Sequence, residues 1–130
     1  MIISSLLIVE DEPFILDMYE EVLRRQMLRV TGVRNGEEAY HLLAEGATFD
    51  VILLDIMLPK TSGVELLEMI KDNGRIILPP VILITNLPDK TVIDRCFALG
   101  AIGTITKSEI TPGQLLPIVQ KILDKKEATS

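Results

Sequence analysis

The sequence predicts a single α/β domain with a doubly wound, five-stranded parallel sheet of strand order 2-1-3-4-5 and five helices. Two observations support this fold class. Short apolar runs such as Val51–Leu54 and Val81–Ile84 contain no alternating polar residues, which is typical of parallel strands buried on both faces. The segments between the runs carry apolar residues at helical spacing. Strands that alternate with helices favour right-handed crossovers and helices on both faces of the sheet.

Length and composition indicate one globular domain. The chain has 130 residues, which is enough for one hydrophobic core but too few for two ordinary domains. Of these residues, 48% are hydrophobic and 25% are charged, as in typical globular proteins. We expect the domain to occupy residues 1–125 and residues 126–130 to form a polar C-terminal tail. The apolar runs are too short for a membrane span, and Met1–Val9 lacks the basic start of a signal peptide. No membrane association and a cytoplasmic location are therefore expected.

The net charge and the presence of only one cysteine and one histidine argue against several classes of function. The net charge of −6, with acidic residues gathered near residues 10–12, 17–21 and 37–38, argues against direct nucleic-acid binding. Cys96 is the only cysteine, which excludes an intrachain disulfide and a multi-cysteine metal site and predicts a small core residue. His41 stands alone among polar positions, which indicates a surface histidine without a metal.

The first part of the chain contains two strand–helix units. A β-branched and leucine-rich run over Ile2–Val9 predicts the first strand, and Pro13 suits the first turn of the helix that follows. Leu28–Thr31 predicts a short second strand. Asn35 supplies a cap for the second helix, whose inner face begins at Ala39.

The middle of the chain contains the two most apolar strands. Val51–Leu54 ends at Asp55, and a loop over residues 60–63 then leads to a third helix that ends at Asn73 and Gly74. Val81–Ile84 predicts the fourth strand, which ends on Thr85. An unpaired carboxylate deep in a core would be costly, so Asp55 is expected at the carboxyl end of its strand, where α/β sheets place their ligand crevices.

The last part predicts a fourth helix over Asp89–Leu99, a weaker fifth strand over Ala101–Thr106, and a final helix that begins near Thr111. Pro117 lies inside this last helical pattern, where it is expected to bend or delay the helix because it removes a backbone hydrogen bond. Residues 124–130 are expected to fray.

Five polar residues are expected to converge, because the carboxyl ends of parallel strands meet at one edge of a sheet: Glu10, Asp11, Asp55, Thr85 and Lys107. Three crowded carboxylates repel each other unless a cation joins them, and such hard oxygen ligands suit Mg²⁺. A lysine and a threonine hydroxyl can hold an anionic oxygen, and carboxylates act as nucleophiles in aspartyl-phosphate chemistry. The pattern predicts a phosphoryl-accepting site with Asp55 as the nucleophile.

Taken in order, these strand-end features resemble the receiver domain of two-component response regulators over nearly the whole chain. The residues that carry the resemblance are Glu10 and Asp11 with Pro13, Asp55 with Pro59 and Gly63, Thr85, and Gly100 and Ala101 ahead of Lys107. Each feature alone has a purely structural explanation, such as a helix cap or a strand end. Together they would require one coincidence at each strand end, which favours the functional interpretation.

The resemblance implies a signalling module that catalyses its own phosphoryl transfer and autodephosphorylation without being a conventional enzyme. Asp55 would accept phosphate from the phosphohistidine of a sensor histidine kinase or from a phosphotransfer protein. Mg²⁺ would be bound by Asp11, Asp55 and the backbone carbonyl of Met57, with Glu10 acting through metal-bound water. The apolar residues Met57 and Leu87 flank the site and predict slow loss of phosphate.

The resemblance also implies a switch that controls a downstream effector protein or domain. Lys107 would pair with a phosphoryl oxygen, and Thr85 would move inward to hydrogen-bond it, which shifts an inactive-to-active equilibrium. Three positions depart from the family pattern: Thr104 replaces the usual aromatic switch residue, Ser108 replaces a proline in a cis bond, and Asn86 replaces a small residue. We therefore expect intact phosphorylation chemistry and unusual transmission of the signal.

Three alternatives fit parts of the sequence. An aspartate-nucleophile phosphohydrolase would need an Asp-x-Asp motif, but Met57 occupies its second position. A flavin-binding domain would need a phosphate-cradling loop where residues 10–12 are acidic. The third is an atypical receiver that acts mainly in protein interaction or dimerisation, with weakened switching. Phe97, at the edge of the helix over residues 89–99, either covers the fifth strand or joins that strand and the last helix in a homodimer face.

Overall fold

Five parallel strands form a single sheet in the order β2-β1-β3-β4-β5 in the computed structural model, which describes residues 2–86 and 89–129. The strands are β1 (Ser5–Val9), β2 (Arg29–Val33), β3 (Val51–Leu54), β4 (Val81–Thr85) and β5 (Ala101–Thr106). The α-helices are α1 (Pro13–Arg25), α2 (Gly36–Ala44), α3 (Gly63–Asp72), α4 (Lys90–Ala98) and α5 (Leu115–Ala128). Two short 3-10 helices, η1 (Lys107–Glu109) and η2 (Pro112–Gln114), connect β5 to α5. The predicted fold class and strand order are confirmed.

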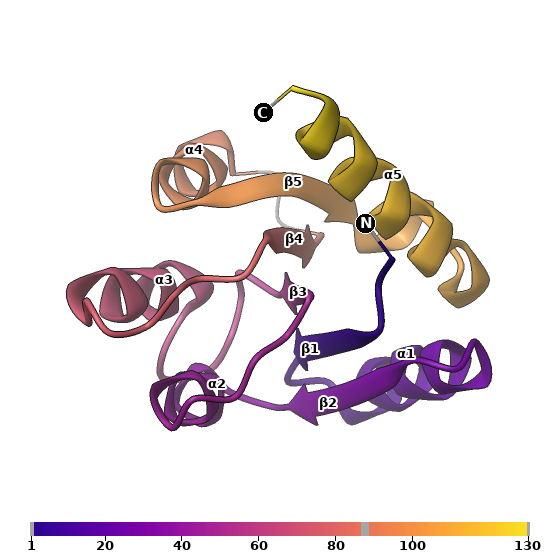
Figure 1. Ribbon diagram of the computed structural model, residues 1–130, viewed down its shortest axis with the longest axis horizontal. Coiled ribbons are helices and arrows are strands. Elements are labelled where there is room, and N and C mark those ends of the chain that lie inside the picture. Colours follow the sequence, from indigo (N-terminus) through magenta and orange to yellow (C-terminus); the bar gives the residue numbers. More distant parts are fainter. Residues whose placement is uncertain (1, 87–88, 130) are drawn as a thin grey trace.

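The sheet is the middle one of three layers, with α1 and α5 on one face and α2, α3 and α4 on the other (Figure 1). Successive residues of β1 show how both faces are buried. Leu7 and Val9 belong to the apolar cluster beneath α2, α3 and α4, whereas Leu6 and Ile8 belong to the cluster beneath α1 and α5. A strand enclosed in this way must be apolar at every position, which explains the uninterrupted runs in the sequence.

The first two strands begin later than the sequence predicted. β1 starts at Ser5 rather than at Ile2, whose side chain is 91% exposed. β2 spans Arg29–Val33 rather than Leu28–Thr31, because its register places each of these residues opposite one residue of β1. The longer strand includes Gly32, where an added Cβ would lie 2.5 Å from a carboxylate oxygen of Glu20 on α1. Pairing with β1 and the close approach of α1 therefore decide where β2 lies.

The final helix also differs from its prediction at both ends. α5 begins at Leu115 after η2, later than Thr111, which agrees with the delay expected from Pro117. Pro117 then lies in the first turn, where its missing N–H group costs the helix no hydrogen bond. Residues 124–128 were expected to fray but form the last turns of α5, and the expected domain boundary at residue 125 falls inside this helix. Lys125 and Lys126 in the last turn interact favourably with the helix dipole, which supports the longer helix.

Several single-residue predictions are confirmed. Cys96 is a fully buried free thiol in the core, and His41 is exposed near the end of α2. None of the helices in the described residues combines the length and the apolar character that a bilayer span requires. Asn35 caps α2, since its side-chain oxygen accepts a hydrogen bond of 2.9 Å from the backbone N–H of Glu38.

Candidate functional site

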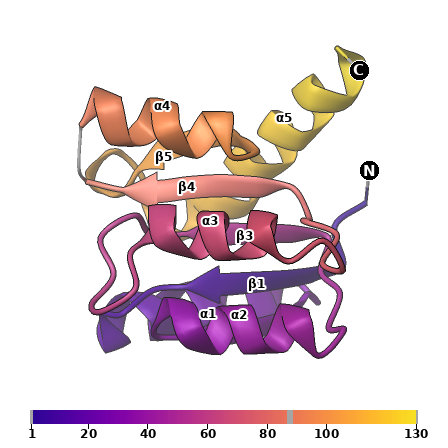
Figure 2. The same ribbon diagram turned by 90° about the vertical axis from the view of Figure 1, so that its left-hand side faces the viewer.

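The carboxyl ends of the strands gather at one edge of the sheet, which lies on the left in Figure 2. At this edge, Glu10 and Asp55 each continue the backbone hydrogen bonding of the sheet by one residue beyond the end of their strand. The backbone N–H of Glu10 donates to Val33, and that of Asp55 donates to Val9, each over 3.0 Å. β4 and β5 end level with each other because Thr85 is paired with Thr106. The register therefore brings Lys107, the residue after Thr106, beside the two acidic residues.

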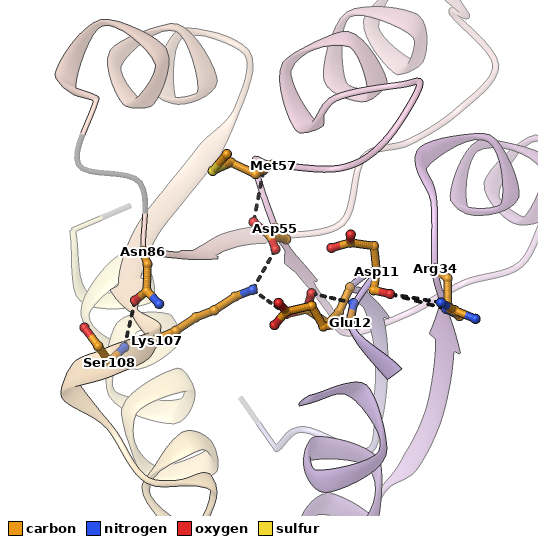
Figure 3. Close-up of polar contacts among 9 residues, drawn as sticks. Asp11, Glu12, Arg34, Asp55, Met57, Asn86, Lys107 and Ser108 are labelled. Atoms are coloured by element: carbon orange, nitrogen blue, oxygen red, sulfur yellow. Dashed lines mark hydrogen bonds and ion pairs between the residues drawn. The ribbon is translucent and has the colours of Figure 1, made fainter. Parts of the chain in front are cut away.

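Lys107 bridges two buried carboxylates (Figure 3). Its Nζ donates a hydrogen bond of 2.7 Å to Asp55 Oδ2 and lies 2.5 Å from Glu10 Oε1. Glu10 is completely buried, Asp55 is 3% exposed, and the side chain of Lys107 is 11% exposed. The backbone N–H of Met57 donates to Asp55 Oδ1 over 3.0 Å, and that of Glu12 donates to Glu10 Oε2 over 3.2 Å. The charged groups are thus held by specific donors in a largely buried site.

Burial and charge act in opposite directions on the ionisation of this pair. Burial raises the pKa of Glu10 above its ordinary value of 4.5, although Lys107 and the N–H of Glu12 oppose the rise. Burial also tends to lower the pKa of Lys107, but hydrogen bonds and charge from Asp55 and Glu10 outweigh it, so this pKa is raised. Lys107 is therefore a stable cation at neutral pH.

The acidic residues offer a site for a cation in addition to Lys107. Glu10, Asp11 and Asp55 each present a carboxylate oxygen, and these atoms lie within 4.8 Å of one another. The buried Glu10 Oε1 has an ion-pair contact with Lys107 but lacks a hydrogen bond of good geometry. Three hard oxygen donors at this spacing, of which one is buried and incompletely satisfied, fit a small divalent cation.

The remaining residues expected at the site, Thr85, Met57 and Thr104, differ in their exposure and in their distance along the chain from the strand ends. Thr85 is 4% exposed at the end of β4, whereas Met57 is 60% exposed in the loop after β3. Thr104 is exposed in the middle of β5 and lines a surface hollow with Phe97, away from the acidic edge. Leu87, expected to limit water access beside Met57, lies outside the described residues. The structure therefore brings the acidic residues and Lys107 together and places Thr85 at the end of the neighbouring strand β4, whereas Thr104 lies elsewhere.

The loop after Asp55 is fixed by a close approach of α3. The N–H of Gly63 donates to the carbonyl oxygen of Ile56 over 3.0 Å. A Cβ at Gly63 would lie 2.9 Å from the carbonyl oxygen of Asp55 and 3.0 Å from the Cα of Ile56. Both of these neighbours are backbone atoms that cannot rotate away, so this position requires glycine.

Two contacts at the site were not predicted. The guanidinium of Arg34 donates to the backbone carbonyl of Asp11 over 3.2 and 3.4 Å. Asn86 Oδ1 accepts a hydrogen bond of 2.8 Å from the backbone N–H of Ser108. Asn86 and Ser108 are each recognisable in the sequence as a departure from the family pattern. No local sequence pattern, however, indicates that these two distant residues are in contact. The described peptide bonds are all trans, in agreement with the expectation for Ser108.

Comparison with known sequences finds relatives that are named as response regulators and transcriptional regulators. The rice protein "Two-component response regulator ORR5" (Oryza sativa subsp. japonica) is 29% identical over 102 residues, which cover 78% of this chain and 75% of the relative. "Transcriptional regulatory protein SrrA" of Staphylococcus aureus (strain NCTC 8325 / PS 47) is 28% identical over 127 residues, or 98% of this chain and 51% of SrrA. The chain thus spans about half the length of SrrA.

Solved structures agree with the sequence comparison. The CheY-like receiver domain protein of Methanospirillum hungatei JF-1 has a TM-score of 0.82 and 27% identity, with coverage of 99% of this chain and 100% of that chain. The chemotaxis response regulator CheY4 of Vibrio cholerae has a TM-score of 0.79 and 26% identity, with coverage of 93% and 99%. The family model of the response regulator receiver domain matches residues 6–120. Because this match covers all five strands except Ser5, together with the acidic residues at their carboxyl ends, the chain belongs to the receiver domains of two-component response regulators, which are signalling modules.

Proposed function

We propose that this chain is a phosphoacceptor module of a two-component phosphorelay and that Asp55 receives the phosphoryl group. The main support is the position of its carboxylate at the end of a buried strand, 2.7 Å from the ammonium of Lys107. Two further carboxylates, of Glu10 and Asp11, lie beside it. The phosphoryl donor is a sensor histidine kinase or a phosphotransfer protein, and the modified domain controls a downstream effector protein or domain.

The proposed reaction is a direct transfer to the carboxylate. An oxygen of Asp55 forms a bond to phosphorus while the bond between phosphorus and the donor's imidazole nitrogen breaks, and the electron pair leaves with that nitrogen. Lys107 neutralises negative charge on the transferred group, and the N–H of Met57 orients the second carboxylate oxygen. Thr85, buried at the adjacent strand end, moves inward to hydrogen-bond the new phosphoryl group and shifts the conformational equilibrium.

Mg²⁺ is the proposed cofactor. Asp11, Asp55 and the backbone carbonyl of Met57 would hold the ion, with Glu10 contributing through bound water. When bound, the ion offsets negative charge on the phosphoryl group during transfer. The balance of charge supports this assignment, since three carboxylates face one ammonium and repel an incoming anion unless another cation is present.

The start of α1 is the proposed docking surface for the phosphoryl donor. Phe14 is 86% exposed and Met18 is 45% exposed, and both follow Asp11 closely in the chain. Large apolar side chains in solvent beside a polar site are typical of protein interaction surfaces. The same proposal places the module in the cytoplasm without direct contact to nucleic acid, in line with its net charge of −6.

The proposal is tested with acetyl phosphate as a small phosphoryl donor. Wild-type protein with Mg²⁺ should gain one phosphoryl group, measured by intact mass, and much less in excess EDTA. Asp55→Asn keeps the shape of the side chain and should gain none, whereas the matched control Asp72→Asn, on the exposed end of α3, should behave like wild type. An adduct that persists in Asp55→Asn, or none in wild type, contradicts the proposal.

Slow loss of the phosphoryl group is a further part of the proposal. Met57, an apolar residue beside Asp55, offers no group that could activate an attacking water. Met57→Asn places a polar amide there and should shorten the lifetime of the adduct in an autodephosphorylation assay. A wild-type lifetime of seconds would rule out slow hydrolysis while leaving Asp55 as the acceptor.

Protein interaction with weakened switching is the second candidate function. Phe97, which is 40% exposed, lines a hollow of about 440 Å³ with Ile102, Gly103, Thr104 and Ile122 on the face formed by α4, β5 and α5. Lys125, Lys126 and Thr129 also line the hollow, but most of its exposed surface is apolar, and Thr104 is too small to fill it. A homodimer through this face predicts a loss of mass on Phe97→Ala in sedimentation experiments. Unchanged mass and unchanged partner affinity would assign Phe97 to packing over β5.

A further inference from the structure

Asn86 and Ser108 connect the two loops that follow Thr85 and Lys107. Asn86 Oδ1 accepts a hydrogen bond of 2.8 Å from the backbone N–H of Ser108 (Figure 3). Ser108 lies in the first turn of η1, where N–H groups have no partner within the helix. Thr106, the residue before η1, makes no side-chain cap, so Asn86 caps this helix from the neighbouring loop.

This contact links the loop after Thr85 to the segment that carries Lys107, the partner of Asp55. Asp55 accepts a hydrogen bond of 2.7 Å from Lys107, which is followed in the chain by Ser108. Ser108 donates to Asn86, which directly follows Thr85, and Thr85 ends the strand next to the one that leads to Asp55. The residues that directly follow Thr85 and Lys107 in the chain are therefore joined by one hydrogen bond outside the sheet.

We propose that Asn86 is a positioning residue that holds the segment of Lys107 and Ser108 over Asp55 and makes this segment move together with Thr85. The inference rests on the proposed function and adds a route for its signal. Thr104, at the usual place of the aromatic switch residue, is exposed and lies outside the acidic edge. The segment tied to Asn86 instead leads through η1 and η2 into α5. Phosphorylation is thus transmitted to the start of α5.

The contact imposes a requirement on each of its two positions. Position 86 must supply a side-chain acceptor, because the bond ends on Oδ1, and position 108 must keep its backbone N–H, which excludes proline. The hydroxyl of Ser108 takes no part in the bond. Two departures from the family pattern are therefore explained by one interaction.

Three variants separate the contact from other effects. Asn86→Ala removes the acceptor, Asn86→Asp keeps an acceptor oxygen at the same place, and Ser108→Ala is the matched control because it keeps the N–H donor. The initial rate of phosphoryl uptake from acetyl phosphate at saturating Mg²⁺ should fall about fivefold in Asn86→Ala, the factor expected when one ordinary hydrogen bond no longer positions Lys107. Ser108→Ala should stay within about twofold of wild type.

Two further measurements distinguish positioning from a general loss of structure. Mg²⁺ affinity should be unchanged in Asn86→Ala, and the unfolding midpoint should fall only by the small amount expected for one hydrogen bond, so that the protein stays fully folded in the assay. The amide resonance of Ser108 and the side-chain resonances of Lys107 should shift. The Ser108 amide in Asn86→Asp should remain close to its wild-type position. A fall in rate that is matched by an equal fall in Mg²⁺ affinity, or that is explained by unfolded protein under the assay conditions, would overturn the positioning role.

The transmission is tested with beryllofluoride as a phosphoryl mimic. In wild type it should shift the amides of Thr85, Ser108 and the first turn of α5. In Asn86→Ala the shift at Thr85 should persist and the other two should disappear. Wild-type behaviour of Asn86→Ala in both uptake and shifts overturns the inference. The proposed function and the positioning role can fail independently. If wild type takes up no phosphoryl group, the proposed function is wrong. If the Lys107 resonances are unchanged in Asn86→Ala, the positioning role is wrong, whatever the result for phosphoryl uptake.

Discussion

Lys107 and Asp55, 52 positions apart in the chain, are joined by a hydrogen bond of 2.7 Å at the edge of the sheet. The same ammonium also contacts Glu10, so a single cation faces a group of three carboxylates. Such a site is poorly balanced in isolation, because the negative charges exceed the positive one. This imbalance of charge predicts opposite effects on folding stability: removal of the lysine should destabilise the metal-free protein, and removal of a carboxylate should stabilise it.

Lys107→Met should destabilise the metal-free protein by about 3 kcal/mol near neutral pH, because it leaves two buried carboxylates without their cation. The loss should shrink in mildly acidic buffer. Burial already raises the pKa of Glu10, and without Lys107 it rises further, so protonation removes the uncompensated charge as the pH falls through that pKa. Urea unfolding in EDTA, at neutral pH and in mildly acidic buffer, measures this loss of stability. The exposed control Lys121→Met should change stability by less than about 0.5 kcal/mol, and equal losses in the two variants would contradict the argument.

Asp11→Asn should have the opposite effect in EDTA and stabilise the protein by about 1 kcal/mol, since it removes one of three mutually repelling charges. Mg²⁺ at ten times its Kd should stabilise wild type by about 1.4 kcal/mol and the variant by much less. Thermal unfolding with and without Mg²⁺ gives both numbers. Asp17→Asn on the exposed face of α1 is the control and should retain the full response to Mg²⁺. Equal responses in Asp11→Asn and wild type would remove Asp11 from the ion site.

The order of the elements could be predicted because it depends on local patterns that the sheet requires. A strand enclosed by two layers must be apolar throughout, so Val51–Leu54 and Val81–Ile84 are visible in the sequence. β2 was placed less well, since Arg29–Val33 is an edge strand of mixed exposure whose limits follow from pairing with β1. The end of α5 was missed for a similar reason, because exposed charged residues are compatible with both a helix and a tail.

The same distinction applies to the site. Glu10, Asp55 and Lys107 could be predicted to converge because each directly follows a parallel strand, and the carboxyl ends of such strands share one edge. The contact of Asn86 with Ser108 depends on the conformations of two loops, for which the sequence carries no periodic signal. Strand-end residues are thus predictable from topology, whereas the contacts that tie their loops together need the structure.

Asp50 should make stability depend on acidic pH at the edge of the sheet opposite to the site. Its carboxylate accepts hydrogen bonds of 2.8 and 2.9 Å from the backbone N–H and hydroxyl of Ser4 and one of 3.1 Å from Ser5, and these bonds lower its pKa below 3.8. The folded state therefore holds this proton less tightly than the unfolded state does. The stabilisation is fully present above pH 3.8 and is lost as the pH falls through the folded pKa.

The measurement for Asp50 is the urea midpoint as a function of pH in wild type and in Asp50→Asn. The variant should be less stable by about 1.5 kcal/mol at neutral pH, where the charged hydrogen bonds are intact in wild type. The two curves should approach each other in strong acid. Asp17→Asn should run parallel to wild type over the whole range, and a constant gap between wild type and Asp50→Asn would exclude the titration of Asp50 as the cause.

Gly63→Ala should damage both the fold and the site, because the added Cβ would lie 2.9 Å from the carbonyl oxygen of Asp55 and 3.0 Å from the Cα of Ile56. Backbone atoms can relieve such a contact only if the loop after β3 moves away from α3. We expect a loss of about 2 kcal/mol in urea unfolding, together with slower phosphoryl uptake, since that loop carries Asp55. Gly74→Ala is the matched control: no atom lies within 4 Å of its Cβ, and it should leave stability unchanged or slightly higher. Normal uptake in a destabilised Gly63→Ala would show that the close approach of α3 supports packing but does not position Asp55.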